Sequence, residues 1–420
     1  MGNKIQAVKG TRDLLPPVTA VWAAVENTVR RVFQTYGYQE IRTPILEETE
    51  LFVRSVGETT DIVGKEMYTF RDRKGRSVTL RPENTASVVR AFVQHGLQIE
   101  SLPVKLFYIG PQFRYERPQK GRYRQFHQIG AELIGDPGPH SDAEVILMLV
   151  RFLSELGFED LVVQLNTVGD ESSRSAYGQG LREFFEPHRD ALSEDSQRRL
   201  ETNPLRILDT KDPDERFLLT GAPQLVDYLN PESRQHFDAV QAVLERQGLS
   251  FRIDPRLVRG LDYYTRTVFE IVSEGLGAQD AIVGGGRYDG LVEELGGPAL
   301  PGIGFAIGED RLIDVLPEAF AREVSPAPTV HVLSVGAVAV EEALAAAEVL
   351  RASGHAVVAE FGGRSLKSAL KRADRSGARW VIIIGDDELA ADEMTVRDLE
   401  VGEQTRIPRD ELVNHLKGLG

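Results

Sequence analysis

The segment from Leu106 to Gly135 constrains the fold of this chain more than any other part of the sequence. Two arms with alternating apolar residues flank a loop that is rich in arginine and lysine. Because this alternation is typical of β-strands, we expect a strand, a long basic loop and a second strand. Alternate side chains of a strand share a face, so Arg114 groups with Glu116 on the first arm. By the same rule, Gln128 groups with Glu132 on the second arm.

A sheet face that carries a guanidinium, carboxylates and a carboxamide is not a hydrophobic core. One interpretation is an exposed hairpin whose polar side chains are solvated. The other is a binding site, which Gly110 and Gly130 favour, because glycine weakens a strand unless something must come close to its backbone. We therefore expect the two arms to line a functional site.

The composition limits the class of protein. A chain of 420 residues is long enough for roughly two or three domains with a large core. Its 49 basic and 64 acidic residues give a formal net charge of −15, which argues against a protein that coats nucleic acid. Contacts with RNA phosphates must then come from local basic patches, such as the loop between the two arms.

Several site classes and locations are excluded by the sequence. The absence of cysteine rules out disulfides and thiolate metal sites and fits a reducing compartment. No histidine cluster has the spacing of metal ligands, so we assign no metal-binding residues. Residues 1–10 lack the apolar core of a signal peptide and no stretch is long enough to span a membrane, so we expect a cytoplasmic protein without membrane contact.

Changes in composition and periodicity along the sequence divide the chain into five parts. Residues 1–169 and 251–323 contain strand and helix patterns that we assign to one core. Between them, residues 170–250 contain charged helical segments broken at Asn-Pro and Asp-Pro pairs, which predicts a helical insertion. Residues 324–328 have the composition of a linker. Residues 329–420 alternate strand and helix as in a small α/β domain, with one basic tract that fits either a solvated helix face or an RNA contact.

Three blocks of the core have residue combinations that periodicity does not explain. Residues 81–85 read Arg-Pro-Glu-Asn-Thr at the expected start of a helix, where Glu83 and Thr85 would ordinarily cap backbone NH groups. Residues 259–265 read Arg-Gly-Leu-Asp-Tyr-Tyr-Thr and lead into a predicted strand. The glycine block at 284–290 lacks the lysine and the spacing of nucleotide-binding loops, so we expect its backbone to run close to a ligand.

These blocks resemble the signature motifs of histidyl-tRNA synthetases, which are class II aminoacyl-tRNA synthetases. The resemblance covers nearly the whole chain. Asn84 stands where such families usually have glycine. The matches are 17–44 with motif 1, 113–128 with motif 2, 301–312 with motif 3, and 259–265 and 285–291 with the two histidine-specific motifs.

The resemblance implies a fold and an activity. The fold would be α+β, with a class II antiparallel sheet core covered by helices, a helical insertion and a C-terminal α/β anticodon-binding domain. The activity would be the ATP-dependent charging of tRNA(His) with L-histidine by a homodimer whose interface motif 1 builds. Mg²⁺ would accompany ATP, held largely by phosphate oxygens and water. The alternative is a noncatalytic regulatory subunit of histidine biosynthesis, a relative that tends to lose the ATP-binding residues and lacks the anticodon-binding domain.

The resemblance also implies roles for particular residues. Arg114 and Arg259 would be catalytic, because two guanidinium groups could stabilise the charge that grows on the α-phosphoryl group of ATP. The histidine-binding residues would be Glu83, Thr85, Gln128, Glu132, Arg259, Tyr263, Tyr264 and Tyr288. The ATP-binding residues would be Arg114, Glu116, Phe126, Arg259 and Arg311. The contacts with the acceptor end of tRNA would be Arg117, Gln119, Arg122 and Arg124.

The implied histidine pocket is chemically consistent. A neutral imidazole needs one acceptor and one donor, because its two ring nitrogens share a single proton. Glu83 could accept from one nitrogen, and the Tyr264 hydroxyl, with Tyr288 nearby, could serve the other. The α-ammonium group needs acceptors, for which Glu132 and Gln128 are candidates together with the Thr85 hydroxyl.

Overall fold

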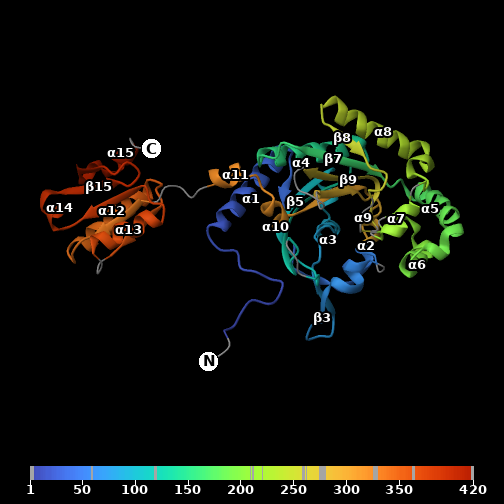
Figure 1. The fold of residues 1–420 in the computed structure, drawn as a ribbon, viewed down its shortest axis with the longest axis horizontal. Coiled ribbons are helices and arrows are strands. Elements are labelled where there is room, and N and C mark those ends of the chain that lie inside the picture. Colours follow the sequence, from blue (N-terminus) through green and yellow to red (C-terminus); the bar gives the residue numbers. More distant parts are fainter. Residues whose placement is uncertain are drawn as a thin grey trace. The chain divides into compact units, whose positions relative to one another are not determined.

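The computed structural model of the chain is shown in Figure 1. It describes residues 4–57, 60–117, 121–208, 210, 212–219, 221–257, 261, 263–273, 281–324, 330–361 and 365–417. The chain forms two compact units, Met1–Glu323 and Val324–Gly420. The predicted linker at 324–328 lies, except for Val324, outside the described residues.

The first unit is built on an eight-stranded sheet in the order β1-β5-β6-β11-β10-β9-β7-β8. All neighbours from β5 to β7 are antiparallel, and β1 and β8 pair in parallel at the two edges. The predicted antiparallel core is therefore confirmed. The strands are β1 (Gln39–Glu40), β5 (Val104–Phe113), β6 (Gln125–Ile134), β7 (Leu161–Thr167), β8 (Phe251–Ile253), β9 (Thr265–Ser273), β10 (Ala281–Arg287) and β11 (Gly302–Gly308).

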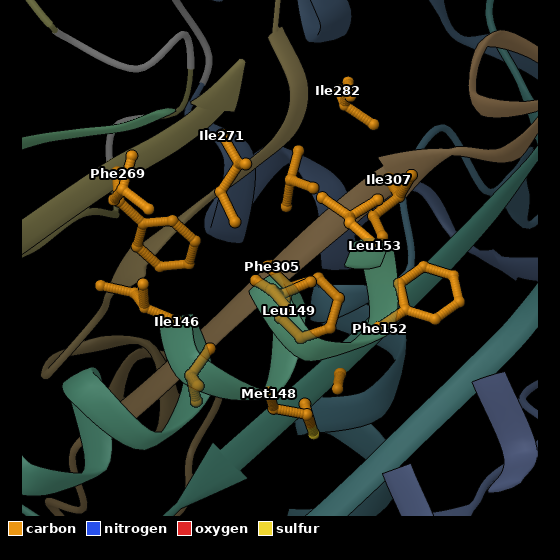
Figure 2. Close-up of a cluster of buried hydrophobic side chains, with 14 of the residues drawn as sticks. Ile146, Met148, Leu149, Phe152, Leu153, Phe269, Ile271, Ile282, Phe305 and Ile307 are labelled. Carbon is orange, nitrogen blue, oxygen red and sulfur yellow. The ribbon is translucent and has the colours of Figure 1, made fainter. Parts of the chain in front are cut away.

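One face of this sheet is apolar and is covered by helices α1 (Val18–Thr35), α4 (Pro139–Glu155) and α8 (Pro231–Arg246). Phe33 of α1 lies at the centre, where its ring makes edge-on contacts with Phe107, Phe152 and Phe305 at centroid distances of 5.6, 5.7 and 5.8 Å. Such aromatic contacts add to the burial of apolar area that drives folding. Figure 2 shows part of this core, with Phe269, Ile271, Phe305 and Ile307 of the sheet beside Ile146, Leu149 and Phe152 of α4.

The opposite face of the sheet carries small and polar residues. Directly opposed residues of an antiparallel pair share a face, so the register places Gly304 beside Glu132 and Gly308 beside Gln128. The same register places Ala306 beside Gly130. Glycine and alanine leave space above the sheet, and the polar side chains between them extend into that space. This face is therefore where the fold can hold a ligand.

Helices rather than strands make up most of residues 170–250. A separate small core joins α5 (Glu171–Phe185) and α6 (Glu194–Thr202) through Tyr177, Leu181 and Leu200, and α7 (Pro213–Leu218) lies in the same segment. Each proline that was predicted to break a helix opens a new one: Pro204 begins a 3-10 turn, Pro213 begins α7 and Pro231 begins α8. Helix α8 packs into the main core instead, through Phe237, Val240 and Leu244.

The first unit also contains a three-stranded sheet in the order β2-β4-β3 and several short helices. The strands are β2 (Leu46–Glu48), β3 (Tyr68–Arg71) and β4 (Ser77–Leu80). The helices are α2 (Thr49–Val56), α3 (Thr85–His95), α9 (Leu291–Glu294), α10 (Glu309–Asp314) and α11 (Glu318–Glu323). None of the described helices is both long and apolar enough to cross a membrane.

The second unit is a five-stranded sheet in the order β13-β12-β14-β15-β16, with β13, β12 and β14 parallel and the last two strands antiparallel. Its alternating strands and helices confirm the predicted α/β domain, whereas the β15–β16 hairpin was not predicted. The elements are β12 (Val330–Ser334), α12 (Ala339–Ala352), β13 (Val357–Glu360), α13 (Leu366–Arg375), β14 (Trp380–Ile384), α14 (Asp386–Ala391), β15 (Glu393–Asp398), β16 (Gln404–Pro408) and α15 (Leu412–Lys417).

A buried charge cluster joins three elements of the first unit. Arg287 of β10 and Asp142 of α4 are completely buried, and Arg287 Nε donates to Asp142 Oδ1 at 3.0 Å. His236 Nε2 of α8 lies 2.8 Å from Asp142 Oδ2. Burial opposes ionisation of Asp142, but the hydrogen bond with His236 and the charge of Arg287 outweigh it and lower the pKa of Asp142. The cluster thereby ties α8 to the glycine-rich strand.

Replacement of Asp142 by asparagine should strongly destabilise the first unit, because it removes the buried counter-charge of Arg287 and leaves the guanidinium only the partly exposed Asp289 at 3.2 Å. We expect a loss of about 3 kcal/mol in the free energy of unfolding, measured by urea denaturation. Removal of the exposed Arg322–Glu318 pair by Arg322→Ala should change it by less than about 0.5 kcal/mol. Equal effects of the two substitutions would contradict this view of the cluster.

Candidate active site

Glu132 of β6 is the centre of the polar face. Its side chain is completely buried. Oε1 accepts a hydrogen bond from the Thr85 hydroxyl at 2.7 Å, and Oε2 accepts one from the Tyr288 hydroxyl at 2.6 Å. Segments that are far apart in the sequence thus meet at one carboxyl group.

The environment of Glu132 controls its ionisation. Burial raises the pKa of Glu132 to about 8, although the hydrogen bonds from Tyr288 and Thr85 favour the ionised form. The nearby charge of Glu83 raises it further. A carboxyl group with this pKa is mostly protonated at neutral pH, and a bound cation would shift it toward the ionised form.

Glu83 lies at the start of α3 and is almost completely buried. Its Oε2 accepts from the backbone NH of Thr85 at 2.7 Å and its Oε1 from that of Ala86 at 3.0 Å. The expected capping role is therefore correct for Glu83, whereas the Thr85 hydroxyl binds Glu132 instead. Burial raises the pKa of Glu83, and the two backbone NH groups oppose this shift. Because a carboxylate oxygen has two acceptor positions, Glu83 can still accept from a ligand.

Tyrosine side chains surround the two carboxyl groups. The ring of Tyr263 lies 4.7 Å from that of Tyr264 and 5.7 Å from that of Tyr288, measured between centroids. Burial, together with nearby carboxylates, raises the pKa values of Tyr263, Tyr288 and Tyr108 well above the ordinary value. These phenols therefore keep their protons and can act as hydrogen-bond donors.

Tyr108 was missed by the sequence analysis. It is opposite Gly130 in the β5–β6 pair, and a Cβ atom at Gly130 would lie 2.3 Å from the Tyr108 hydroxyl. A Cβ atom at Gly110 would lie 2.8 Å from Arg81 Nη2. The expected close approach at both glycines is therefore confirmed, and the groups that approach are side chains of the chain itself. The pairing of a large residue with glycine across two predicted strands was the available signal.

The side chain of Asn84 accepts two hydrogen bonds that a glycine could not accept. Its Oδ1 accepts from Arg81 Nη1 at 3.0 Å and from the Thr43 hydroxyl at 2.7 Å. Arg81 also donates to the Pro111 carbonyl at 3.0 Å. This network fixes the loop that carries Glu83 against the end of β5, so Asn84 has a structural role.

A cleft of about 710 Å³ has Tyr264 in its lining. Arg114 lies in its wall, with Nε donating to the Pro82 carbonyl at 2.9 Å and the guanidinium 5.4 Å from the centre of the Phe126 ring. Nη1 of Arg114 is 4.0 Å from Glu116, which also pairs with Arg122 at 3.3 Å. The opposite wall comes from residues 170–250 and includes Arg174, Arg182, Arg199 and Arg206.

The residues of the basic loop have different environments. Arg117 and Arg122 are exposed. Arg124 stacks on Tyr115, with the guanidinium 4.0 Å from the ring centre, and its Nη1 donates to the Lys9 carbonyl at 3.3 Å. Gln119 lies outside the described residues.

Gln128 and Arg311 lie close together at one end of the polar face. Gln128 is buried, and its carbonyl oxygen has no hydrogen-bond partner in the described part of the chain. Arg311 is the third residue of the short helix α10 and belongs to its last turn, and its Cβ atom lies 3.8 Å from the position of a Cβ atom at Gly308, the residue opposite Gln128. Arg259 lies outside the described residues, so its position beside Arg114 stays a prediction.

Comparisons with known proteins agree with this geometry. A family model described as "Histidyl-tRNA synthetase" matches residues 10–170 and 190–312, and one described as "Anticodon binding domain" matches 329–419. The histidine–tRNA ligase of Halothermothrix orenii is 50% identical over 99% of this chain and 99% of its own length. That of Halorhodospira halophila is 51% identical over 100% of this chain and 99% of its own length.

Solved structures give the same result. The structure of apo Staphylococcus aureus histidyl-tRNA synthetase has a TM-score of 0.83 and 38% identity, and the match covers 99% of this chain and 100% of that chain. A Bacillus halodurans structure described as an ATP phosphoribosyltransferase regulatory subunit/histidyl-tRNA synthetase has a TM-score of 0.68 and 24% identity, over 92% of this chain and 99% of that chain. The second likeness concerns the fold alone.

Replacement of Tyr288 by phenylalanine should raise the pKa of Glu132 above about 8, because the lost hydrogen bond stabilises the ionised form. The titration can be followed by NMR of protein labelled at the glutamate side-chain carboxyl carbon. Tyr68→Phe, at a tyrosine of the small sheet, should leave this titration unchanged. An unchanged or lower pKa in Tyr288→Phe would contradict the assignment.

The same pKa predicts a pH dependence of stability. Because the folded-state pKa of Glu132 is above the ordinary value, its stabilising contribution is complete in acid and is lost as the pH rises through about 8. The urea unfolding free energy of Glu132→Gln should therefore fall less steeply with pH than that of the wild type.

Proposed function

This chain belongs to the histidyl-tRNA synthetase family, and on that premise we propose that it is an ATP-dependent histidine–tRNA ligase. It joins L-histidine to ATP as histidyl-adenylate with release of pyrophosphate, and then transfers the histidine to the 3′ end of tRNA(His). The observation that supports this best is the buried Glu132, held by Thr85 and Tyr288, beside a cleft whose wall contains Arg114.

The polar pocket suits histidine as a ligand. Ionised Glu132 would pair with the α-ammonium group, and the unpartnered carbonyl oxygen of Gln128 could accept from the same group. The remaining acceptor positions of Glu83 would serve one imidazole nitrogen and the Tyr264 hydroxyl the other. An amino acid without both ring nitrogens would leave buried polar groups unpaired, which can give large discrimination.

The cleft suits ATP. Phe126 would stack on the adenine ring and Glu116 would accept from its edge, while Arg114 would hold the α-phosphate and the histidine carboxylate. Arg311 of α10 would bind the γ-phosphate. Arg259 would complete the charge stabilisation of the transferred group.

Mg²⁺ would enter with the triphosphate and neutralise part of its charge. In the described part of the chain, no group of three or more His, Cys, Asp and Glu could hold a metal. Glu66 and Glu116 line the cleft, and burial together with the charge of Glu116 raises the pKa of Glu66. The ion would therefore be held mainly by phosphate oxygens and water.

The tRNA would contact both units. Arg117, Arg122 and Arg124, with Gln119, would meet the acceptor end, and the second unit would bind the anticodon, as its family match suggests. We also propose that the protein is a homodimer whose interface is formed by the motif 1 elements α1 and β1. We also propose a cytoplasmic location, with which the absence of cysteine is consistent.

Purified protein should charge total tRNA with histidine in an ATP-dependent reaction, measured with radiolabelled histidine. A regulatory subunit of histidine biosynthesis would bind histidine and charge no tRNA, so binding without charging would overturn the proposal. The comparisons do not favour that alternative, because the histidine–tRNA ligases match over the whole chain, including 329–419.

Arg259→His should slow adenylation by about 10²- to 10³-fold, because it removes a charge that acts in the transition state. Binding of ATP and histidine, measured by calorimetry, should change little. The rate is measured by histidine-dependent pyrophosphate exchange, with Arg322→His as the matched surface control. Exchange at the wild-type rate in Arg259→His would refute this role.

A further inference from the structure

Residues 8–12, here called the N-terminal strap, lie against the second arm of the basic loop. The Thr11 backbone NH donates to the Val8 carbonyl at 2.9 Å, which closes a turn. The Gly10 carbonyl then accepts from the backbone NH of Arg124 at 2.7 Å. In Figure 1 this part of the chain precedes α1 and has no helix or strand.

The strap is held by polar contacts and not by apolar packing. Val8 is 69% exposed, and Ile5, just before the strap, is fully exposed. Apolar side chains that stay in water contribute no burial energy to docking. The side chain that anchors the strap is Arg12, whose Nη2 donates to Asp310 Oδ1 at 2.7 Å. Its guanidinium also stacks on Tyr123, 4.2 Å from the ring centre.

Asp310 connects this anchor to the nucleotide site. Asp310 is buried, and its Oδ2 accepts a hydrogen bond from the backbone NH of His127 at 2.7 Å. Burial opposes ionisation of Asp310, but hydrogen bonds with His127 and Arg12 outweigh it and lower its pKa. Asp310 directly precedes Arg311, and His127 directly follows Phe126. One carboxylate therefore links the strand segment that carries Phe126 to the helix that carries Arg311, the two residues that would hold opposite ends of ATP.

We propose that Arg12 is a positioning residue for ATP. Through Asp310 and Tyr123 it fixes the arm that carries Phe126 relative to the helix that carries Arg311. This inference rests on the proposed function, since it requires Phe126 to bind adenine and Arg311 to bind the γ-phosphate. Histidine binds around Glu132, where Arg12 has no contact, so loss of Arg12 should affect the two substrates differently.

The test compares Arg12→Ala, Arg12→Lys and the surface control Arg322→Ala in histidine-dependent pyrophosphate exchange. Arg12→Ala should raise the KM for ATP by about tenfold or more, because small misplacements of binding groups are costly. The KM for histidine should change by less than about twofold, as only the nucleotide groups are displaced. Arg12→Lys should restore part of the ATP affinity, since an ammonium group can still pair with Asp310 but does not stack on Tyr123 as a guanidinium does.

Calorimetric titration with ATP gives a second measurement that does not depend on turnover. A weaker ATP affinity in Arg12→Ala, with the unfolding midpoint unchanged, supports the positioning role. Equal effects on ATP and histidine, no effect on either, or unfolding of Arg12→Ala would overturn it in favour of a purely structural strap. Absence of exchange in the wild type would instead refute the proposed function. The ATP titration does not require turnover, so it would still test the role of Arg12 in that case.

Discussion

The site depends on one buried carboxyl group that receives hydrogen bonds from two distant segments. Glu132 is completely buried, so its oxygens need partners inside the protein, and the hydroxyls of Thr85 and Tyr288 supply them. These contacts draw the start of α3 and the end of β10 onto the same strand. The pocket and the raised pKa of Glu132 therefore have one physical origin, a carboxyl group that the fold excludes from water.

The sheet can hold this site because one face packs against helices in the core, whereas the other face carries the small and polar residues of the site. Phe305 and Ile307 point into the core beneath α1 and α4, whereas Gly304 and Ala306, between and beside them, leave the other face open. A β-branched or aromatic residue at Gly304 would collide with Glu132, since even a Cβ atom there would lie 1.7 Å from Oε2. Alternation along each strand thus separates the residues that pack the core from those that line the site.

Much of the fold followed from local patterns. The strands on both sides of the basic loop, the helix that begins at Thr85 and the proline-broken helices all form where periodicity and helix-start signals place them. The role of Thr85 did not follow, because capping and a bond to Glu132 use the same hydroxyl and only spatial neighbours distinguish them. The structural role of Asn84 could not be predicted for the same reason, because the fold brings its partners Arg81 and Thr43 to it.

The sequence by itself determined which residue types were available and on which face of each strand they lie, because alternation and turn signals are local properties of the chain. Tertiary structure alone decided which of those faces meet. It paired Arg287 with Asp142 and His236, and joined Arg12 to Asp310. Contacts between segments so far apart depend on the packing of the whole sheet, so no local pattern encodes them.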